Sequence, residues 1–184
     1  MTPMIKKILM TFGAIVAIIF LFFIYQKFIN HNFHTVEKGV LYRSAQPTPE
    51  MLKEYKDKYG IKSVISLRRA RPDKEWYRQE IRASEELGMA HYDVALSSTM
   101  PAPMKKMEEL VQILKTAERP MLIHCLGGSD RTGLGVALYF YAVKEIPPQI
   151  AVKKSLSVLY GHFPYLWMNT DAMSQSFYRY TKKY

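Results

Sequence analysis

Cysteine is the scarcest residue type in this chain of 184 residues, and Cys125 is its single representative. One cysteine excludes an intramolecular disulfide framework and any metal site built from clustered cysteines. Acidic residues are also few, 16 against 26 lysines and arginines, which gives a net charge of +10 at pH 7. This excess fits anionic substrates or an anionic lipid surface equally well, and no spacing of residues indicates a nucleic-acid-binding module.

Hydrophobic material is plentiful by comparison. Apolar residues make up 48% and aromatic residues 13% of the chain, which excludes disordered, collagen-like and low-complexity classes. At about 150 residues per domain the length accommodates one globular unit and an appendage. We find no internal repeat and no internal linker long enough to separate two domains.

The appendage is an N-terminal apolar segment. Ile8 to Tyr25 form an uncharged run that at about 1.5 Å per residue spans about 27 Å, close to the roughly 30 Å of a hydrocarbon core. No small-residue cleavage site follows it, so an uncleaved membrane anchor is favoured over a signal peptide or a buried core helix. The sequence therefore predicts an anchor in residues 1–30 and one globular domain in residues 31–184.

The orientation of this anchor depends on flanking charges that nearly balance. Lys6 and Lys7 precede the segment, whereas Lys27, Lys38 and Arg43 follow it. A short basic tail ahead of a first apolar segment is typical of an export signal, and large downstream domains translocate regardless of their charge. We therefore expect a single-pass protein with its globular part outside the cytoplasm, although the nearly equal charges leave the cytoplasmic side open.

Strand and helix patterns alternate through the globular part. Residues 36–47 form an extended opening segment that ends in a turn, and Thr48 and Gly60 bracket the first helix as cap and stop. Strands are then expected at 61–67, 89–96 and 120–124, and helices at 74–87, 104–117, 132–144, 149–160 and 169–182. This alternation predicts an α/β fold with a central, mainly parallel sheet flanked by helices.

A compact motif lies between the third of these strands and the helix that follows it. His124 and Cys125 are followed, after five residues, by Arg131, Thr132 and Gly133, the pattern H-C-x5-R-T-G. A loop of backbone N–H groups closing on a helix N-terminus binds phosphate, and two glycines in the loop permit the tight turns it needs. Arginine holds two phosphate oxygens at once. A thiol in the same field should ionise readily and attack phosphorus.

This motif resembles the signature of cysteine-dependent protein tyrosine and dual-specificity phosphatases. With residues 41–47 (LYRSAQP) and 160–164 (YGHFP) beside it, the chain is similar over about residues 32–184 to small membrane-anchored bacterial members, for which the extracytoplasmic side is the periplasm. The resemblance implies the fold of dual-specificity phosphatases, and it implies an enzyme that uses no metal and no cofactor.

The resemblance also implies roles for individual residues. Cys125 would be the nucleophile that forms a phosphocysteine intermediate, Arg131 would bind the phosphoryl group, and Thr132 would assist breakdown of the intermediate. His124 would orient the loop and support ionisation of the thiol. The remaining loop residues would contact the substrate phosphate: Leu126, Gly127, Gly128, Ser129 and Asp130.

The general acid is less clearly indicated. Asp93 precedes Cys125 by a spacing similar to that in dual-specificity members, but residues 97–103, which resemble the mobile acid loop, contain no acidic residue. Asp130 competes, since some branches place an aspartate at that position of the loop. We favour Asp93 and keep Asp130 as the alternative.

Substrate contacts outside the loop are expected from Arg68, because the carboxyl ends of strands border the ligand crevice in open α/β sheets. The loop itself contains no cation, so a phosphorylated protein or another singly phosphorylated group is favoured over polyphosphoinositides. A lipid-phosphate phosphatase of the same fold and an inactive phosphate-binding module are the alternatives. His31 and His34 lie beside the membrane segment without further ligands and do not indicate a metal site.

Overall fold

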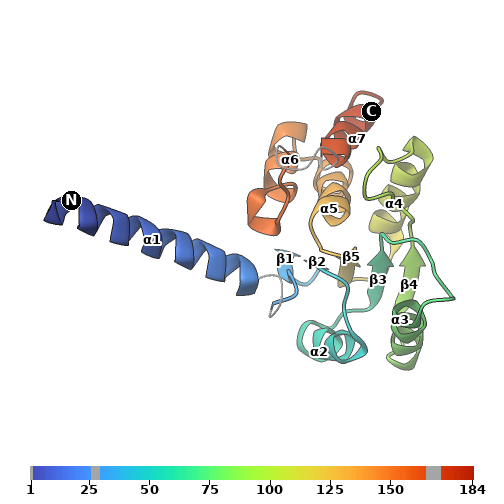
Figure 1. The fold of residues 1–184 in the computed structure, drawn as a ribbon. Helices are drawn as coiled ribbons and strands as arrows, with labels where there is room; N and C mark the ends of the chain where they lie inside the picture. Colours follow the sequence, from blue (N-terminus) through green and yellow to red (C-terminus); the bar gives the residue numbers. More distant parts are fainter. Residues whose placement is uncertain (1, 26–29, 165–170) are drawn as a thin grey trace.

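The computed structural model describes residues 2–25, 30–164 and 171–184. A five-stranded sheet forms the centre of the globular part, and helices cover both of its faces (Figure 1). The elements are, in chain order, α1 (Pro3–Ile24), β1 (His34–Glu37), β2 (Leu41–Ser44), α2 (Pro49–Tyr59), β3 (Ser63–Ser66), α3 (Glu75–Glu86), β4 (Ala90–Asp93), α4 (Met104–Thr116), β5 (Met121–His124), α5 (Asp130–Ala142), α6 (Pro148–Ser155), the 3-10 turn η2 (Val158–Tyr160) and α7 (Asp171–Thr181).

The strand order is β1-β2-β5-β3-β4, and every pair is parallel except β1 with β2. The predicted α/β class with a mainly parallel sheet is thus confirmed. The opening segment is not one extended stretch, because Gly39 adopts a φ of 73° and folds it into an antiparallel hairpin. β2 consequently lies inside the sheet, directly beside β5.

Local capping explains where the first helix of the domain begins and ends. The Thr48 side chain accepts a hydrogen bond from the Met51 amide, and Pro49 starts the helix with its φ already suitable. Gly60 ends it in the left-handed region at a φ of 69°. The last predicted helix but one is shorter than expected: α6 stops at Ser155, and η2 continues the chain.

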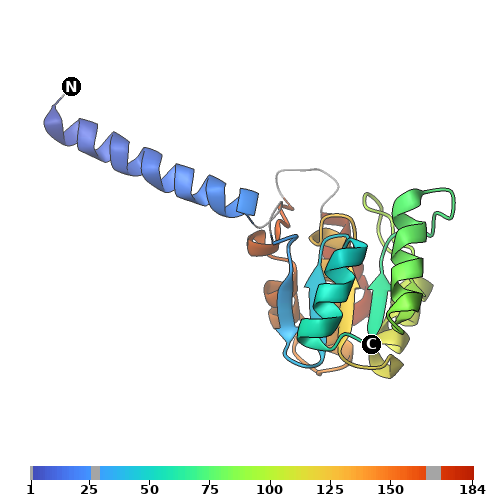
Figure 2. The ribbon, with the colours of Figure 1, turned by 90° about the horizontal axis from the view of Figure 1, so that it is seen from below.

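Two layers of helices enclose the sheet (Figures 1 and 2). α2 and α3 pack on one face, and α4, α5, α6 and α7 pack on the other. The alternation of side chains along each strand feeds both layers: Leu122 belongs to the α2–α3 core, whereas its neighbours Met121 and Ile123 belong to the other. The central strands β2, β3 and β5 are buried on both faces.

The last residues of four strands lie in one row across the sheet. Ser44, His124, Ser66 and Asp93 are register partners in that order, at the carboxyl ends of β2, β5, β3 and β4. Since neighbouring strands are about 4.8 Å apart, Asp93 lies about 10 Å from His124 along this row. The row defines the edge of the sheet at which the H-C-x5-R-T-G motif begins.

The N-terminal helix is separate from this core. Residues Pro3–Phe22 are apolar and long enough to cross a membrane, and none of the window is buried against the rest of the chain. A signal sequence has the same properties near an N-terminus. The structure therefore supports a helix capable of spanning a bilayer.

Candidate active site

The motif forms a loop between the end of β5 and the start of α5. Cys125 follows β5 directly and is buried. Asp130, Arg131 and Thr132 make up the first turn of α5, which therefore begins two residues earlier than the sequence predicts. The positive end of the helix dipole points into the loop that holds the thiol.

The carbonyl groups of this loop accept hydrogen bonds from the β1–β2 hairpin and from the residues directly before and after it. The Asn32 amide donates to the Gly127 carbonyl at 2.9 Å, and the Arg43 guanidinium donates to the Gly128 carbonyl at 2.8 Å and to the Ser129 carbonyl at 3.3 Å. The backbone N–H of Gln46 donates to the Leu126 carbonyl at 3.2 Å. These contacts hold the loop in one conformation.

The amide groups face the opposite way. Within the described part of the chain, the N–H groups of residues 126–131 donate to no carbonyl and no side chain. Consecutive N–H groups that diverge from their carbonyls make an anion-binding concavity. The loop after Cys125 therefore has consecutive N–H groups without protein acceptors, which is what the binding of a phosphoryl group requires.

Gly128 is required at the crossing of the loop and β2. Its φ is 69°, and a Cβ atom built on it would lie 2.6 Å from the Ser44 carbonyl oxygen and 2.7 Å from the Ala45 nitrogen. Backbone atoms cannot move aside as a flexible side chain would. Any larger residue would push the loop away from the strand that supports it.

Arg43 is a fully buried cation behind the loop. Besides its two loop contacts it donates to the Ser155 carbonyl at 2.9 Å, and its guanidinium lies 4.0 Å from the centre of the Tyr160 ring. Burial lowers its pKa to about 10, while Tyr160, Cys125 and Asp130 act in the opposite direction. Arg43 stays charged at neutral pH and adds positive potential near the thiol.

His124 lies under the loop, on the α3 side of the sheet. Its Nε2 is 3.0 Å from Glu80 Oε1, and its Nδ1 is 3.3 Å from the Cys125 carbonyl oxygen. His91 Nε2 reaches the same Glu80 oxygen at 2.7 Å. Burial alone would raise the pKa of Glu80, but the charges and hydrogen bonds of the two histidines outweigh it and hold the pKa well below its usual range.

Arg68, in the segment after β3, is held by Gln46 and Trp76. Its guanidinium lies 3.4 Å from the centre of the Trp76 ring and donates to Gln46 Oε1 at 2.7 Å. Burial and the nearby charge of Arg131 lower the pKa of Arg68, whereas Glu80 and Cys125 raise it. Arg68 therefore lies within electrostatic reach of both Cys125 and Arg131.

Asp93, the favoured acid, is held at the end of β4. Its Oδ2 accepts a hydrogen bond from the Tyr77 hydroxyl and lies 4.0 Å from His91 Nδ1. Its Oδ1 is buried and has no partner among the described residues. The structure places this carboxyl group near Glu80 and His91, at the β4 end of the row that also contains His124.

Asp130, the competing acid, is held from the other side. Its Oδ1 lies 2.6 Å from Nδ1 of His162, whose side chain is 2% exposed. Ser174 on α7 approaches the second ring nitrogen of His162 at 3.4 Å. Asp130 is therefore tied to the helices that follow the loop, and this tie accounts structurally for the histidine in the YGHFP segment.

The remaining motif residues occupy distinct positions around the thiol. Arg131 has no hydrogen bond or ion pair from its side chain within the described ranges, and the buried hydroxyl of Thr132 likewise has no partner there. Leu126 is 59% exposed at the rim, and the Ser129 hydroxyl donates to the Tyr160 carbonyl at 2.6 Å. Among the described residues, no group of three or more metal-ligating side chains converges.

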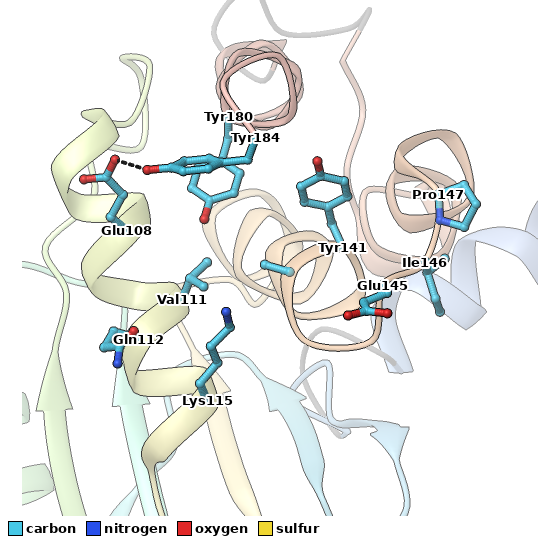
Figure 3. Close-up of a pocket in the computed structure, with 11 residues that line it drawn as sticks. Glu108, Val111, Gln112, Lys115, Tyr141, Glu145, Ile146, Pro147, Tyr180 and Tyr184 are labelled. Carbon is cyan, nitrogen blue, oxygen red and sulfur yellow. Dashed lines mark hydrogen bonds between the residues drawn. The ribbon is translucent and has the colours of Figure 1, made fainter.

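A separate groove of about 520 Å³ opens between α4, α5 and α7 (Figure 3). Tyr141, Tyr180 and Tyr184 line it, and Figure 3 shows the Tyr184 hydroxyl bonded to Glu108. It lies at the far end of α5, about 20 Å from the loop by the length of that helix. With two glutamates and one lysine on its walls it offers no cradle for an anion.

Sequence reasoning missed the supports of this site. Glu80 lies on a polar helix, and a signal was available because it shares the inward stripe of α3 with the buried residues Ala83 and Ser84. Asn32 and Gln46 carry no comparable signal, because each precedes or follows a strand in a segment without periodicity. Their roles depend on a loop about 80 to 95 residues away in sequence.

Comparison with known proteins agrees with this geometry. Residues 30–165 match the family model described as a Swiss Army Knife protein, DSP-PTPase phosphatase domain. Among curated proteins, none matches the chain at a significant level of sequence similarity.

Solved structures share the fold at low sequence identity. TpbA of P. aeruginosa superposes with a TM-score of 0.63 and 22% identity, covering 82% of this chain and 85% of that one. PTPMT1 gives 0.62 and 14%, covering 82% and 97%. The catalytic domain of the phosphatase Siw14 from S. cerevisiae gives 0.61 and 20%, covering 83% and 91%. The family match over most of the chain and the loop that surrounds Cys125 together show that this chain belongs to the cysteine-based dual-specificity phosphatase family.

Proposed function

We propose that the protein hydrolyses phosphate monoesters through a phosphocysteine intermediate on Cys125. The observation that carries this proposal is the loop itself, with its carbonyl groups held outward by Arg43, Asn32 and Gln46 and its N–H groups left for an anion. Such a loop binds the phosphoryl group and stabilises the charge that develops on its oxygens in the transition state.

In the first step the Cys125 thiolate attacks phosphorus, an S–P bond forms, and the P–O bond to the leaving group breaks. The departing oxygen takes a proton from the general acid, for which we propose Asp93. The choice is supported by Oδ1 of Asp93, which is buried and makes no hydrogen bond among the described residues, so that a proton on it would not be shared with another protein group. Arg131 holds the phosphoryl oxygens throughout.

In the second step water attacks the phosphocysteine. The S–P bond breaks, the thiolate is restored, and the carboxylate left by the first step takes the proton from water. The Thr132 hydroxyl, which has no other partner among the described residues, is proposed to stabilise the sulfur as it leaves. Inorganic phosphate is the second product.

Replacing the nucleophile is the direct test. Cys125→Ser should lower hydrolysis of p-nitrophenyl phosphate to background while leaving the affinity for inorganic phosphate near the parent value, because the donor loop remains. Steady-state kinetics and phosphate titration measure the two quantities. Parental turnover in this variant would refute the covalent mechanism. Phosphate binding without hydrolysis in the parent protein would instead identify a phosphate-binding module, which the absence of an acid in residues 97–103 favours as the second candidate.

For the substrate we propose phosphotyrosine or another singly phosphorylated group. Residues 126–130 contain no cation and one carboxylate, Asp130, which repels additional phosphates. The structure of TpbA in complex with pTyr supports this class, whereas PTPMT1 in complex with PI(5)P supports a lipid phosphate as the alternative.

A side-by-side panel of phosphotyrosyl peptides, phosphoseryl peptides and lipid phosphates measures this preference. We expect the highest kcat/KM for the phosphotyrosyl peptides. A preference for a trisphosphorylated lipid would contradict the charge argument, and a preference for a singly phosphorylated lipid would select the alternative.

We further propose that α1 is an uncleaved single-pass anchor and that the catalytic domain lies outside the cytoplasm. The support is the apolar length of α1 and the basic tail of Lys6 and Lys7 before most of it. An anchored domain would act on substrates at or near the membrane surface.

A further inference from the structure

Glu80 is a buried carboxylate that the proposed steps do not use. It lies on α3, and 0% of its side chain is exposed. Its two carboxylate oxygens contact different parts of the chain. Oε1 lies 3.0 Å from His124 Nε2 and 2.7 Å from His91 Nε2, while Oε2 accepts a hydrogen bond from the Gln46 side-chain amide. A carboxylate costs several kcal/mol to bury without partners, so an unused one at this place calls for a role.

The protonation states follow from counting donors and acceptors. An amide N–H can only donate, so Glu80 Oε2 must accept. His124 faces the Glu80 carboxylate with Nε2 and the Cys125 carbonyl oxygen, at 3.3 Å, with Nδ1. Both atoms opposite the ring are acceptors, and only the imidazolium form carries a proton on both nitrogens. The geometry thus pairs a negative Glu80 with a positive His124, directly next to the nucleophile in the chain.

The charged groups that face Glu80 from the elements packed against it are consistent with an ionised Glu80 carboxylate. His91 approaches Glu80 from β4, His124 from β5 and Arg68 from the segment after β3, and all three favour the ionised carboxylate. Tyr77, on the same helix, responds to Glu80 through a raised pKa of about 12, to which burial and its bond to Asp93 contribute more. No second carboxylate contacts Glu80 among the described residues.

The second oxygen connects the same carboxylate to the substrate side. Gln46 is held by Glu80 through its amide nitrogen, which leaves its carbonyl oxygen to accept from Arg68 at 2.7 Å. Arg68 in turn stacks on Trp76. Glu80 on α3 therefore orients His124 directly and Arg68 through Gln46.

We propose that Glu80 is a positioning residue that keeps His124 protonated behind Cys125 and, through Gln46, fixes the guanidinium of Arg68 beside the substrate. The inference rests on the proposed function in one respect, namely that the Cys125 thiolate serves as the nucleophile. Its two readouts, thiol reactivity and histidine protonation, require no turnover and so fail or succeed separately from it.

The first experiment compares Glu80→Gln with Glu86→Gln, an exposed glutamate on the same helix. Alkylation of Cys125 by iodoacetamide is measured against pH. In Glu80→Gln the pH of half-maximal alkylation should rise by about one unit, because a neutral His124 no longer stabilises the thiolate. In Glu86→Gln it should match the parent. A folded Glu80→Gln with a parental alkylation profile would overturn the proposal.

A second variant separates the two branches. Gln46→Ala removes the bond to Arg68 and leaves the Glu80–His124 pair in place. It should raise KM for a phosphotyrosyl peptide about tenfold, the order of one lost charge-assisted contact, with the alkylation profile unchanged. An altered alkylation profile with an unchanged KM would contradict the assignment of the branches.

The unmodified protein provides a test that does not depend on the folding of any glutamate variant. In ¹⁵N spectra of histidine-labelled protein, the His124 ring, assigned by its loss in His124→Gln, should carry protons on both nitrogens at pH 7.5. A neutral ring at that pH would overturn the proposal whether or not the enzyme turns over.

Discussion

At the scale of single residues, the identity of the general acid depends on which of two aspartates loses a proton to the leaving group. Each is held by a different partner, Asp93 by Tyr77 and Asp130 by His162. General acid assistance is worth about 10² to 10⁴ in rate and matters most for poor leaving groups. Asp93→Asn should therefore reduce kcat/KM for phosphotyrosine at least about a hundredfold but should affect an activated aryl phosphate much less.

Asp93→Asn and Asp130→Asn are both assayed on the two substrates. The surface variant Asp57→Asn is the control, because the ion-pair partner of the exposed Asp57 in the described part of the chain is Lys53, on the same helix α2. We expect Asp130→Asn to change phosphate affinity and thiol reactivity, because its carboxylate lies in the first turn of α5, which follows the loop that holds the nucleophile. If only Asp130→Asn shows the loss that depends on the leaving group, the acid lies within the loop and the assignment to Asp93 is wrong.

At the scale of elements, the β1–β2 hairpin supports the catalytic loop through Arg43. Its guanidinium reaches the carbonyls of Gly128, Ser129 and Ser155, which no single ammonium group can do in the same geometry. Arg43→Lys should keep the charge, lower the free energy of unfolding by about 1–3 kcal/mol for carbonyls left without donors, and lower kcat/KM as the loop loosens.

Urea denaturation and steady-state kinetics measure these two effects. Arg69→Lys is the matched control, because Arg69 is exposed and should tolerate lysine without change. Parental stability together with parental activity in Arg43→Lys would show that the hairpin does not hold the loop.

At the scale of the whole molecule, the proposed anchor α1 would decide where the chemistry takes place. The globular part has its own core, and none of the buried residues described in that core belongs to α1. We expect the full-length protein to fractionate with membranes and a chain of residues 31–184 to be soluble with parental kcat/KM on a soluble aryl phosphate.

Protease added to intact spheroplasts tests the orientation. Digestion of residues 31–184 is the expected result for a domain outside the cytoplasm. Full protection, combined with cleavage after lysis, would place the domain in the cytoplasm. Release of the domain without α1 would identify a cleaved signal sequence.

Much of the fold could be read along the chain because its determinants are local. The cap at Thr48, the stop at Gly60 and the apolar stripe of α4 each predict their element from residues within one or two turns. The sequence predicts a single extended segment where the structure has the hairpin of β1 and β2, because its turn has only Gly39 as a signal. Pairing of β2 with β5, across about 80 residues, has no local signal at all.

In the candidate site, too, some features depend on local sequence and others on contacts between distant residues. The sequence alone predicts Cys125 as the nucleophile and Arg131 as the phosphate-binding arginine, because a phosphate loop needs its thiol, its glycines and its arginine within one short segment whose spacing is visible in the chain. Only the tertiary structure revealed Glu80, Gln46 and Arg43, which reach the loop from α3 and the hairpin. A buried charge or amide acquires its function from the partner it meets in space, and that partner is set by how the sheet and helices pack.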